Sequence, residues 1–394
     1  MDNPFRVFDQ IRQTFLRYLD SPFRLRYEAL REERRSLLNR DRQLYREPLI
    51  EPVAPYQSSG LTIAGACDRL GISQDVADFI ASGLFSGDRE LYEHQVQAWE
   101  LSRRGRAVVV TSGTGSGKTE AYLIPIFASL VEESRRGWGT PQPPPANHLW
   151  WRHRHQSRVP QRGHQAPQRV SAVRALLLYP LNALIEDQLG RIRKACDGPE
   201  GRQWLDTQRN GNRFWFGRYT SATPVPGLPG VPSKASELKK RLRRMDGDWT
   251  AALSSAATRN NPRILDFFQN PEGSEMWSRW DMHDQPPDIL ITNYSMLNIM
   301  LMRSVENNIF ESTRQWLEQD REAHVFHLVI DELHTYRGTP GTEVGYLLRA
   351  FLHRIGLTPD SPQLRVIATS ASIEDDADSS ILSSSWGGTD RHFP

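Results

Sequence analysis

The amino-acid sequence predicts an α/β fold in which helices cover a doubly wound, mostly parallel sheet. Its short apolar runs are continuous rather than alternating, as expected of strands buried on both faces. Helical patterns separate the runs, which suits crossover connections between parallel strands. A tight glycine-rich turn joins the first run to the helical pattern after it. The candidate strands are residues 107–111, 175–179, 213–219, 288–292, 326–330 and 364–369.

Residues 1–85 are predicted to form a helical accessory segment before the α/β lobe. A break at Asp20, Ser21 and Pro22 separates a first helix from a second, and a short helix is expected over residues 73–85. The lobe is then expected over residues 86–380, followed by a tail over 381–394. The apolar residues at helical spacing in the first helix are Phe8, Ile11, Phe15, Leu16 and Leu19.

Two stretches of the lobe are longer than the connections between strands require, and we interpret them as insertions. Residues 135–171 are rich in Pro, Arg, His and Gln without periodicity, which predicts a flexible insertion. Residues 224–286 contain a basic helical run around Lys239–Arg244 and two tryptophans, Trp277 and Trp280, that we expect in the core. The basic run and "WWRHRH" (150–155) are compatible with nucleic-acid contacts. A solvated helix and a disordered loop are the favoured alternatives.

Composition narrows the class of protein without identifying a partner. The chain has 49 Lys and Arg against 47 Asp and Glu, so whole-chain charge argues neither for nor against nucleic acid. Its two cysteines, Cys67 and Cys196, suggest neither a disulfide framework nor a zinc site. The start lacks a secretory pattern, and no stretch approaches 18 apolar residues. We therefore expect a cytoplasmic protein without a membrane partner.

The turn after residues 107–111 has the composition of a phosphate-binding loop. Glycines at 115 and 117 allow backbone N–H groups to approach phosphates closely, Lys118 supplies a cation, and Thr119 supplies a hydroxyl ligand for Mg²⁺. The helix that follows offers its positive N-terminal end. The sequence thus predicts ATP and Mg²⁺ as cofactors. The predicted nucleotide-binding residues of the loop are Ser112, Gly113, Thr114, Gly115, Ser116, Gly117, Lys118 and Thr119.

An acidic pair follows the apolar run 326–330, at the edge of the sheet where ligands of α/β proteins bind. Asp331 suits the role of a Mg²⁺ ligand, and Glu332 that of a group that orients the attacking water. With Lys118 they are the predicted catalytic residues. Acidic pairs after a strand are also commonly solvated and without function. His334 is interpreted either as linked to the ligand or as a turn residue.

Taken together, these motifs resemble those of superfamily 2 helicases of the DExH type. "SGTGSGKT" resembles motif I, in which serine often stands at the position of Ser112, and "DELH" resembles motif II. "LYEHQ" looks like the upstream glutamine motif, which makes Gln95 the expected reader of adenine. "ATSAS" resembles motif III, which implies that Ser370 and Ser372 couple with His334. The implied fold is the first RecA-like lobe of a helicase.

Two further stretches sharpen that resemblance. "YPLNALIEDQ" (179–188) is similar to motif Ia and "TNYSML" (292–297) to motif Ic. Together with "DELHTYRG" they resemble the YprA-like, RecQ-related branch, whose largest members include anti-phage helicases of the Druantia and DISARM types. In such helicases these motifs hold the backbone of one strand, so single-stranded DNA is the expected partner. Asn182 and Asn293 could alternatively be helix caps. The resemblance assigns nucleic-acid contacts to Pro180, Leu181, Asn182, Thr292 and Asn293.

The resemblance also implies a second RecA-like lobe. That lobe carries a "QxxGRxGR" motif, which the sequence does not contain. An arginine finger is worth about 10³–10⁵ in turnover, so we expect low activity from this chain alone. A partner polypeptide or a further region would supply the second lobe. The expected function is an ATP-dependent DNA helicase or translocase; the alternative is a non-enzymatic nucleotide- or DNA-binding regulatory module. A P-loop kinase or GTPase is disfavoured, because motifs Ia and Ic would then be coincidences.

Overall fold

The computed structural model describes residues 3–22, 25–40, 43–46, 55–113, 115–227, 231–336 and 339–371. Contacts divide the chain into two compact units, Met1–Pro55 and Tyr56–Pro394. None of the helices described is long and apolar enough to cross a membrane. The helices are α1 (Pro4–Asp20), α2 (Glu28–Leu38), α3 (Ile63–Leu70), α4 (Gln74–Gly83), α5 (Glu93–Arg103), α6 (Lys118–Ser134), α7 (Asn182–Asp197), α8 (Pro199–Gln208), α9 (Pro232–Thr258), α10 (Arg279–Asp284), α11 (Tyr294–Met302), α12 (Asn307–Gln319) and α13 (Thr339–Arg354).

The larger unit is built on a six-stranded sheet in the order β3-β8-β7-β4-β6-β5, with every neighbouring pair parallel. This topology confirms the predicted α/β, doubly wound class. Two short strands, β1 (Ser58–Thr62) and β2 (Glu90–Tyr92), form a separate antiparallel pair that the sequence did not reveal. The strands of the main sheet are β3 (Val108–Thr111), β4 (Ala175–Tyr179), β5 (Phe216–Tyr219), β6 (Ile289–Asn293), β7 (Phe326–Ile330) and β8 (Leu364–Ser370).

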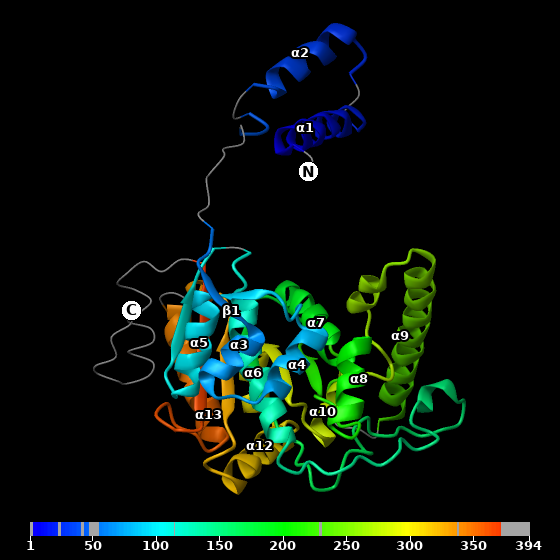
Figure 1. Cartoon of the computed structure of the whole chain (residues 1–394). Helices are drawn as coiled ribbons and strands as arrows, with labels where there is room; N and C mark the ends of the chain where they lie inside the picture. Colours follow the sequence, from blue (N-terminus) through cyan, green and yellow to red (C-terminus); the bar gives the residue numbers. More distant parts are fainter. Residues whose placement is uncertain are drawn as a thin grey trace. The chain divides into compact units, whose positions relative to one another are not determined.

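Two apolar clusters lie on opposite faces of this sheet, and consecutive side chains of each central strand point into different clusters. Leu177 and Ile291 pack with helices α3 to α8, whereas Leu176 and Leu290 pack with α11, α12 and α13. Figure 1 shows α3 and α5 in front of the sheet, while α9 stands at the side of the unit. Burial on both faces explains why these strands read as continuous apolar runs.

The predicted accessory segment is shorter in the structure than in the sequence-based expectation. The boundary between the two units lies after Pro55, not at residue 85. Helices α3 and α4 belong to the larger unit, because Val76, Phe79 and Ile80 are fully buried in its core. In the smaller unit, α1 and α2 are joined by ion pairs from Arg34 and Arg35 to Asp20.

The insertion 135–171, predicted to be flexible, is instead packed. Trp150 and Trp151, in the 3₁₀ helix η1 (Trp150–Arg152), are buried against α9. Trp151 also lies edge-on to Trp277, with ring centroids 4.5 Å apart. Trp277 and Trp280 are core residues, as predicted. The two insertions therefore stabilise each other through a shared apolar cluster.

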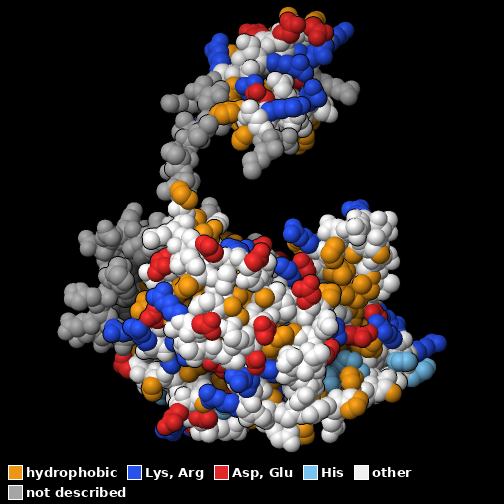
Figure 2. Space-filling view, viewed as in Figure 1, with side chains coloured by type: hydrophobic (Ala, Val, Ile, Leu, Met, Phe, Trp, Pro, Cys, Tyr) orange, Lys and Arg blue, Asp and Glu red, His pale blue; other side chains and the backbone are white. Residues whose placement is uncertain are grey.

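Charged side chains are mixed over the visible surface of the larger unit. Figure 2 shows Lys and Arg interspersed with Asp and Glu, and hydrophobic side chains gathered beside α9. The 3₁₀ helix η2 (Pro262–Phe267), which packs against α9, exposes 77% of Phe267.

A buried charge cluster joins the first insertion to the amino-terminal edge of the sheet. Asp288, directly before β6, accepts hydrogen bonds from Arg169 at 2.6 Å, Arg174 at 2.9 Å and the Trp215 N–H at 2.7 Å. Arg162 Nη2 lies 3.7 Å from the same carboxylate. Burial alone would raise the pKa of Asp288, but the three arginines hold it below its usual value.

Candidate functional site

The predicted phosphate loop lies between the carboxyl end of β3 and the first turn of α6. The hydroxyls of Ser112 and Ser116 are 2.6 Å apart across the loop. The Ser112 N–H donates to the carbonyl of Ser370 on β8 at 3.3 Å, which ties the loop to the neighbouring strand. Thr114 lies outside the described residues. Lys118 and Thr119 begin α6, where the helix end favours a negative charge.

Left-handed backbone at two glycines shapes this loop. Gly115 has a φ of 80° and Gly117 a φ of 76°, a region that side-chain-bearing residues rarely adopt. A Cβ at Gly117 would also collide with the amide of Gln95. Glycine is therefore required at 117 by the protein's own packing, in addition to the approach of a phosphate.

Gln95 braces the loop. Its Nε2 donates to the carbonyl of Gly117 at 3.0 Å, and its Oε1 accepts from the N–H of Tyr92 at 3.0 Å. Only 2% of Gln95 is exposed. The amide keeps one further N–H and one further lone pair. The structure thus shows a positioning contact that the resemblance, which makes Gln95 the reader of adenine, does not include.

Lys118 and the acidic pair meet at the carboxyl-terminal edge of the sheet. Lys118 Nζ lies 3.9 Å from Glu332 Oε1. The Asp331 N–H donates to the carbonyl of Leu178 at 2.9 Å, which continues the ladder between β7 and β4. The hydroxyl of Thr369 donates to the Asp331 carboxylate and also accepts from the Glu332 N–H at 3.3 Å. The three residues predicted to be catalytic are therefore brought together.

Burial dominates the electrostatics of Asp331, which is only 8% exposed. Removal from water raises the pKa of this carboxyl, and the charge of Glu332 raises it further. The hydrogen bond from Thr369 and the charge of Lys118 act in the opposite direction. A divalent cation would relieve the same cost by neutralising the buried carboxylate.

Glu332 adopts the left-handed conformation, with φ and ψ both 52°. One of its carboxylate oxygens lies 3.3 Å from His334 Nδ1, and the same nitrogen is 3.5 Å from the Ser370 hydroxyl. His334 and Ser370 thus connect the acidic pair to β8, as the predicted coupling role requires. Ser372, the third predicted coupling residue, lies outside the described residues.

The donor atoms at this place suit a Mg²⁺ ion that substrate phosphates help to bind, rather than a metal held by protein ligands alone. Thr119 and Asp331 offer a hydroxyl and a carboxylate, which are hard oxygen ligands. In the ranges described, no group of three or more His, Cys, Asp or Glu could hold a metal. Mg²⁺ usually binds through one or two carboxylates and substrate phosphates, so this sparse set is what such a site needs.

An aromatic group beside the loop was missed by the sequence analysis. Tyr92 and His94 are stacked with ring centroids 5.6 Å apart, and Tyr56 lies 5.5 Å from Tyr92. The Tyr56 hydroxyl lies so close to Gly113 that a Cβ there would be 2.8 Å from it. Burial lowers the pKa of His94. Tyr56 stands in a proline-rich connector without periodicity, so no local signal marks it.

Four of the five predicted nucleic-acid residues are at least partly accessible. Leu181 is 63% exposed, and the amides of Asn182 and Asn293 are joined by a hydrogen bond of 2.9 Å across the ends of β4 and β6. Asn293 also caps α11, accepting from the Met296 N–H at 2.8 Å, so the capping alternative holds for this residue. Pro180 is half-buried.

Thr292 differs from the expectation. Its side chain is fully buried, and its hydroxyl donates to the carbonyl of Tyr219 at 2.7 Å. The hydroxyl can reach this carbonyl because Thr292 lies opposite Tyr219 in the pairing of β6 with β5. Its hydroxyl is therefore a structural group, not a surface contact for nucleic acid.

Comparison with known proteins finds similarity to helicases. Residues 92–213 match the DEAD/DEAH box helicase family. Druantia protein DruE of Escherichia coli (strain UMEA 4076-1) is 32% identical over 401 aligned positions, which cover 91% of this chain and 20% of that protein. The chain thus spans about a fifth of the length of this relative.

Solved structures of helicases are also similar to this chain. The DUF1998 helicase MrfA bound to DNA and AMPPNP has 19% identity and a TM-score of 0.45, over 85% of this chain and 30% of that one. The helicase Lhr of Mycobacterium smegmatis, bound to ssDNA and AMP-PNP, has 17% identity and a TM-score of 0.44, over 81% and 26%. The family match over residues 92–213 and the sequence identity make this chain similar to DEAD/DEAH box helicases and homologous to about a fifth of Druantia protein DruE.

Proposed function

We propose that this chain is the ATP-binding first lobe of an ATP-dependent DNA helicase or translocase. The observation that carries the proposal is the contact of Lys118 with Glu332, at 3.9 Å, beside a loop with left-handed glycines at 115 and 117. A cation, an acidic pair and a helix N-terminus at one edge of a parallel sheet are the parts that phosphoryl transfer to water needs.

In this proposal, backbone N–H groups of the loop and Lys118 hold the β- and γ-phosphates. Thr119 and Asp331 hold Mg²⁺, which neutralises charge developing on the transferred phosphoryl group. Glu332 accepts a hydrogen bond from the attacking water and orients it. The Lys118–Glu332 contact keeps both groups in place before the nucleotide arrives. Gln95, Tyr92 and His94 lie beside the loop where an adenine would be read.

We infer that efficient hydrolysis needs a second RecA-like lobe from a partner polypeptide or a further region. The lobe described supplies one wall of the nucleotide site, and an arginine from the opposite wall would complete it. The strand-binding edge is proposed around Leu181 and the Asn182–Asn293 pair, which contact phosphate and sugar without reading sequence. Similarity to DruE supports a place in an anti-phage system.

The decisive experiment is ATP hydrolysis by the chain together with a polypeptide that carries the second lobe. Single-stranded DNA should stimulate turnover, and the chain alone should turn over slowly. Nucleotide binding without any stimulated hydrolysis would favour a regulatory module over an enzyme. DNA affinity that does not change between 50 and 200 mM salt would contradict backbone binding, since phosphate contacts release counterions.

Replacing Asn182 by alanine is expected to weaken binding of a single-stranded oligonucleotide by about three- to tenfold, the worth of one hydrogen bond. The change removes the partner of the Asn293 amide and one polar contact to the strand. Fluorescence anisotropy of a labelled oligonucleotide measures it. Asn307→Ala on α12 is the matched control, because this exposed amide accepts a hydrogen bond from Arg354 and takes no part in the proposed edge. Equal losses in both variants would refute the proposed edge.

A further inference from the structure

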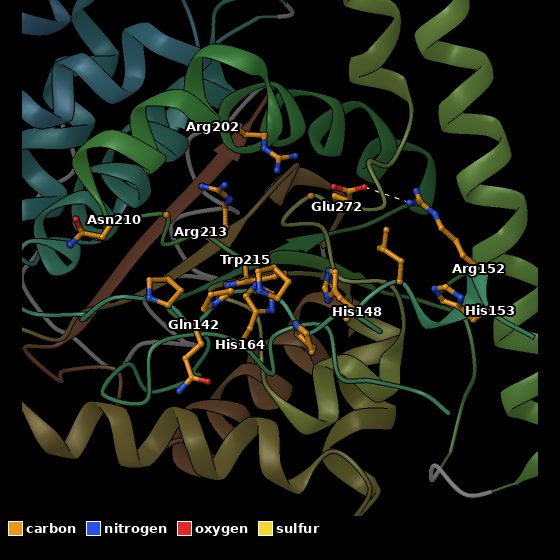
Figure 3. A pocket seen from close by; sticks show the side chains of 18 residues that line it. Gln142, His148, Arg152, His153, His164, Arg202, Asn210, Arg213, Trp215 and Glu272 are labelled. Atoms are coloured by element: carbon orange, nitrogen blue, oxygen red, sulfur yellow. Dashed lines mark ion pairs between the residues drawn. The ribbon is translucent and has the colours of Figure 1, made fainter. Parts of the chain in front are cut away.

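A cavity of about 600 Å³ lies at the opposite edge of the sheet from the phosphate loop. Arg213 and Trp215, which line it, directly precede β5 and so mark the amino-terminal edge. Its other walls come from the insertion 135–171 and from the loop that contains Glu272 (Figure 3). This size lies within the range of about 300–1,000 Å³ typical of small-molecule sites.

The cavity carries an excess of positive charge. Arg202, Arg213 and Arg152 line it, against a single carboxylate, Glu272. Arg152 is already engaged, with two hydrogen bonds of 2.7 Å to Asp246 and a 3.7 Å ion pair with Glu272.

The other two arginines have capacity left. Arg213 pairs with Asp206 at 2.6 Å through Nη2, but its Nη1 is buried without a hydrogen-bond partner. Arg202 interacts electrostatically with Asp197, but within the described ranges no hydrogen bond or close ion pair joins its guanidinium to a partner. Figure 3 shows both side chains on the same wall of the cavity. An arginine fork without a partner is the group that proteins use to bind phosphate.

Two histidines add unsatisfied polar atoms at the same place. The rings of His148 and His164 lie 5.2 Å apart at 85°, and Nδ1 of each is buried without a partner. Burial, with the nearby charges, lowers the pKa of His164 to about 4, so its imidazole is neutral at physiological pH. Buried polar atoms without partners are rare in folded proteins. With Arg213 Nη1, three such atoms belong to side chains that line the cavity, and each atom lies behind its surface.

The remaining lining suits an organic, planar body. Leu149 and a run of prolines (143–145) provide apolar walls, while Trp215, only 3% exposed, meets His164 edge-on at 6.1 Å behind them. The amides of Gln142 and Asn210 offer donors and acceptors of the kind that read the edge of a base. The walls are held in place, since the Gln142 N–H donates to the carbonyl of His164 at 2.8 Å.

We propose that this cavity is a second ligand site that binds a nucleoside monophosphate, with the phosphate on Arg202 and Arg213 and the base against Leu149 and the proline wall. The site does not depend on the ATP site, because the two lie at opposite edges of the sheet. In this proposal, the insertion 135–171 forms part of a ligand-binding site.

The test is calorimetric titration of the whole chain with AMP, adenosine and inorganic phosphate. AMP should bind, and adenosine should bind at least tenfold more weakly, since it lacks the group that the arginines hold. Arg202→Gln should weaken AMP binding by about tenfold or more, the worth of a charge-assisted hydrogen bond. Arg213→Gln is the second variant, with a thermal melt to show that each variant is folded.

Two controls separate this site from the ATP site. Arg259→Gln, at the exposed end of α9, should leave AMP affinity unchanged. Arg202→Gln should weaken AMP binding but leave ATP binding unchanged. The proposal is overturned if AMP does not bind, if adenosine binds as tightly as AMP, or if Arg202→Gln leaves AMP affinity unchanged.

Discussion

Replacing Lys118 by alanine is expected to weaken ATP binding by about 10- to 100-fold, because a charge-assisted contact to the phosphates is lost. Turnover in the presence of the second lobe should fall by about 10²–10³, since the ammonium group also stabilises charge in the transition state. The change also removes the ammonium group that lies 3.9 Å from the Glu332 carboxylate. Fluorescent-nucleotide titration and a phosphate-release assay measure the two effects.

The control for this change is Lys240→Ala, which removes an exposed lysine from α9, far along the chain from the loop. It should leave nucleotide affinity unaltered. If Lys118→Ala bound ATP as tightly as the unmodified chain, the assignment of residues 112–119 as a phosphate loop would be wrong.

Replacing Asp288 by alanine is expected to destabilise the larger unit by about 3–5 kcal/mol, since it leaves buried arginines without their counter-charge. Asp288, Arg162 and Arg169 have fully buried side chains, and Arg174 is nearly so. The Trp215 N–H would lose its acceptor as well. Chemical denaturation, followed by tryptophan fluorescence, measures the free energy of unfolding. Asp187→Ala is the matched control: that carboxylate is 71% exposed, and its loss should cost less than about 1 kcal/mol.

The same cluster predicts how the stability of the fold changes with pH. The pKa of Asp288 in the folded chain lies below that of an exposed aspartate. Its stabilisation is therefore complete above about pH 4, where the carboxyl is ionised even in the unfolded chain, and is lost as the pH falls through the folded pKa. Asp288→Ala should lose this acid-induced step. An unchanged acid transition would mean that another carboxylate controls it.

Most of the sheet could be predicted from the sequence, because burial on both faces leaves continuous apolar runs. All six predicted runs became strands, with ends shifted by at most a few residues. The largest shift is at β5, predicted from residue 213 but beginning at Phe216. The reason is not local: the Trp215 N–H bonds Asp288 instead of a strand partner. The order of the strands could not be read at all, since it depends on pairings between distant segments.

The insertion shows where pattern reading fails. Residues 135–171 have no periodicity because they form almost no regular structure, yet they are fixed by long-range contacts. Gln161 bonds the Trp277 N–H at 2.8 Å and the carbonyl of Glu275 at 2.8 Å, partners more than a hundred residues away. Arg152 is held in the same way by Asp246. Such partners carry no signal in the neighbouring sequence.

The residues proposed to bind nucleotide could be named from the sequence, but the contacts that hold them in place could not. Lys118, Asp331 and Glu332 are recognisable because their chemistry forces a short, fixed pattern at strand ends. Thr369 was missed as the hydrogen-bond donor to Asp331, although it lies inside the segment "ATSAS" that resembles motif III. Tyr56 reaches the loop from a connector, where nothing in the spacing of residues marks it.

The place of β8 in the sheet has a mechanical consequence. This strand stands between β3 and β7, so the phosphate loop and the acidic pair do not touch through their own strands. Ser370 holds the loop through Ser112, while Thr369, one residue earlier, holds Asp331. β8 thus contacts both the loop and the acidic pair. We therefore expect a displacement of the carboxyl end of β8 to move the loop and Asp331 together.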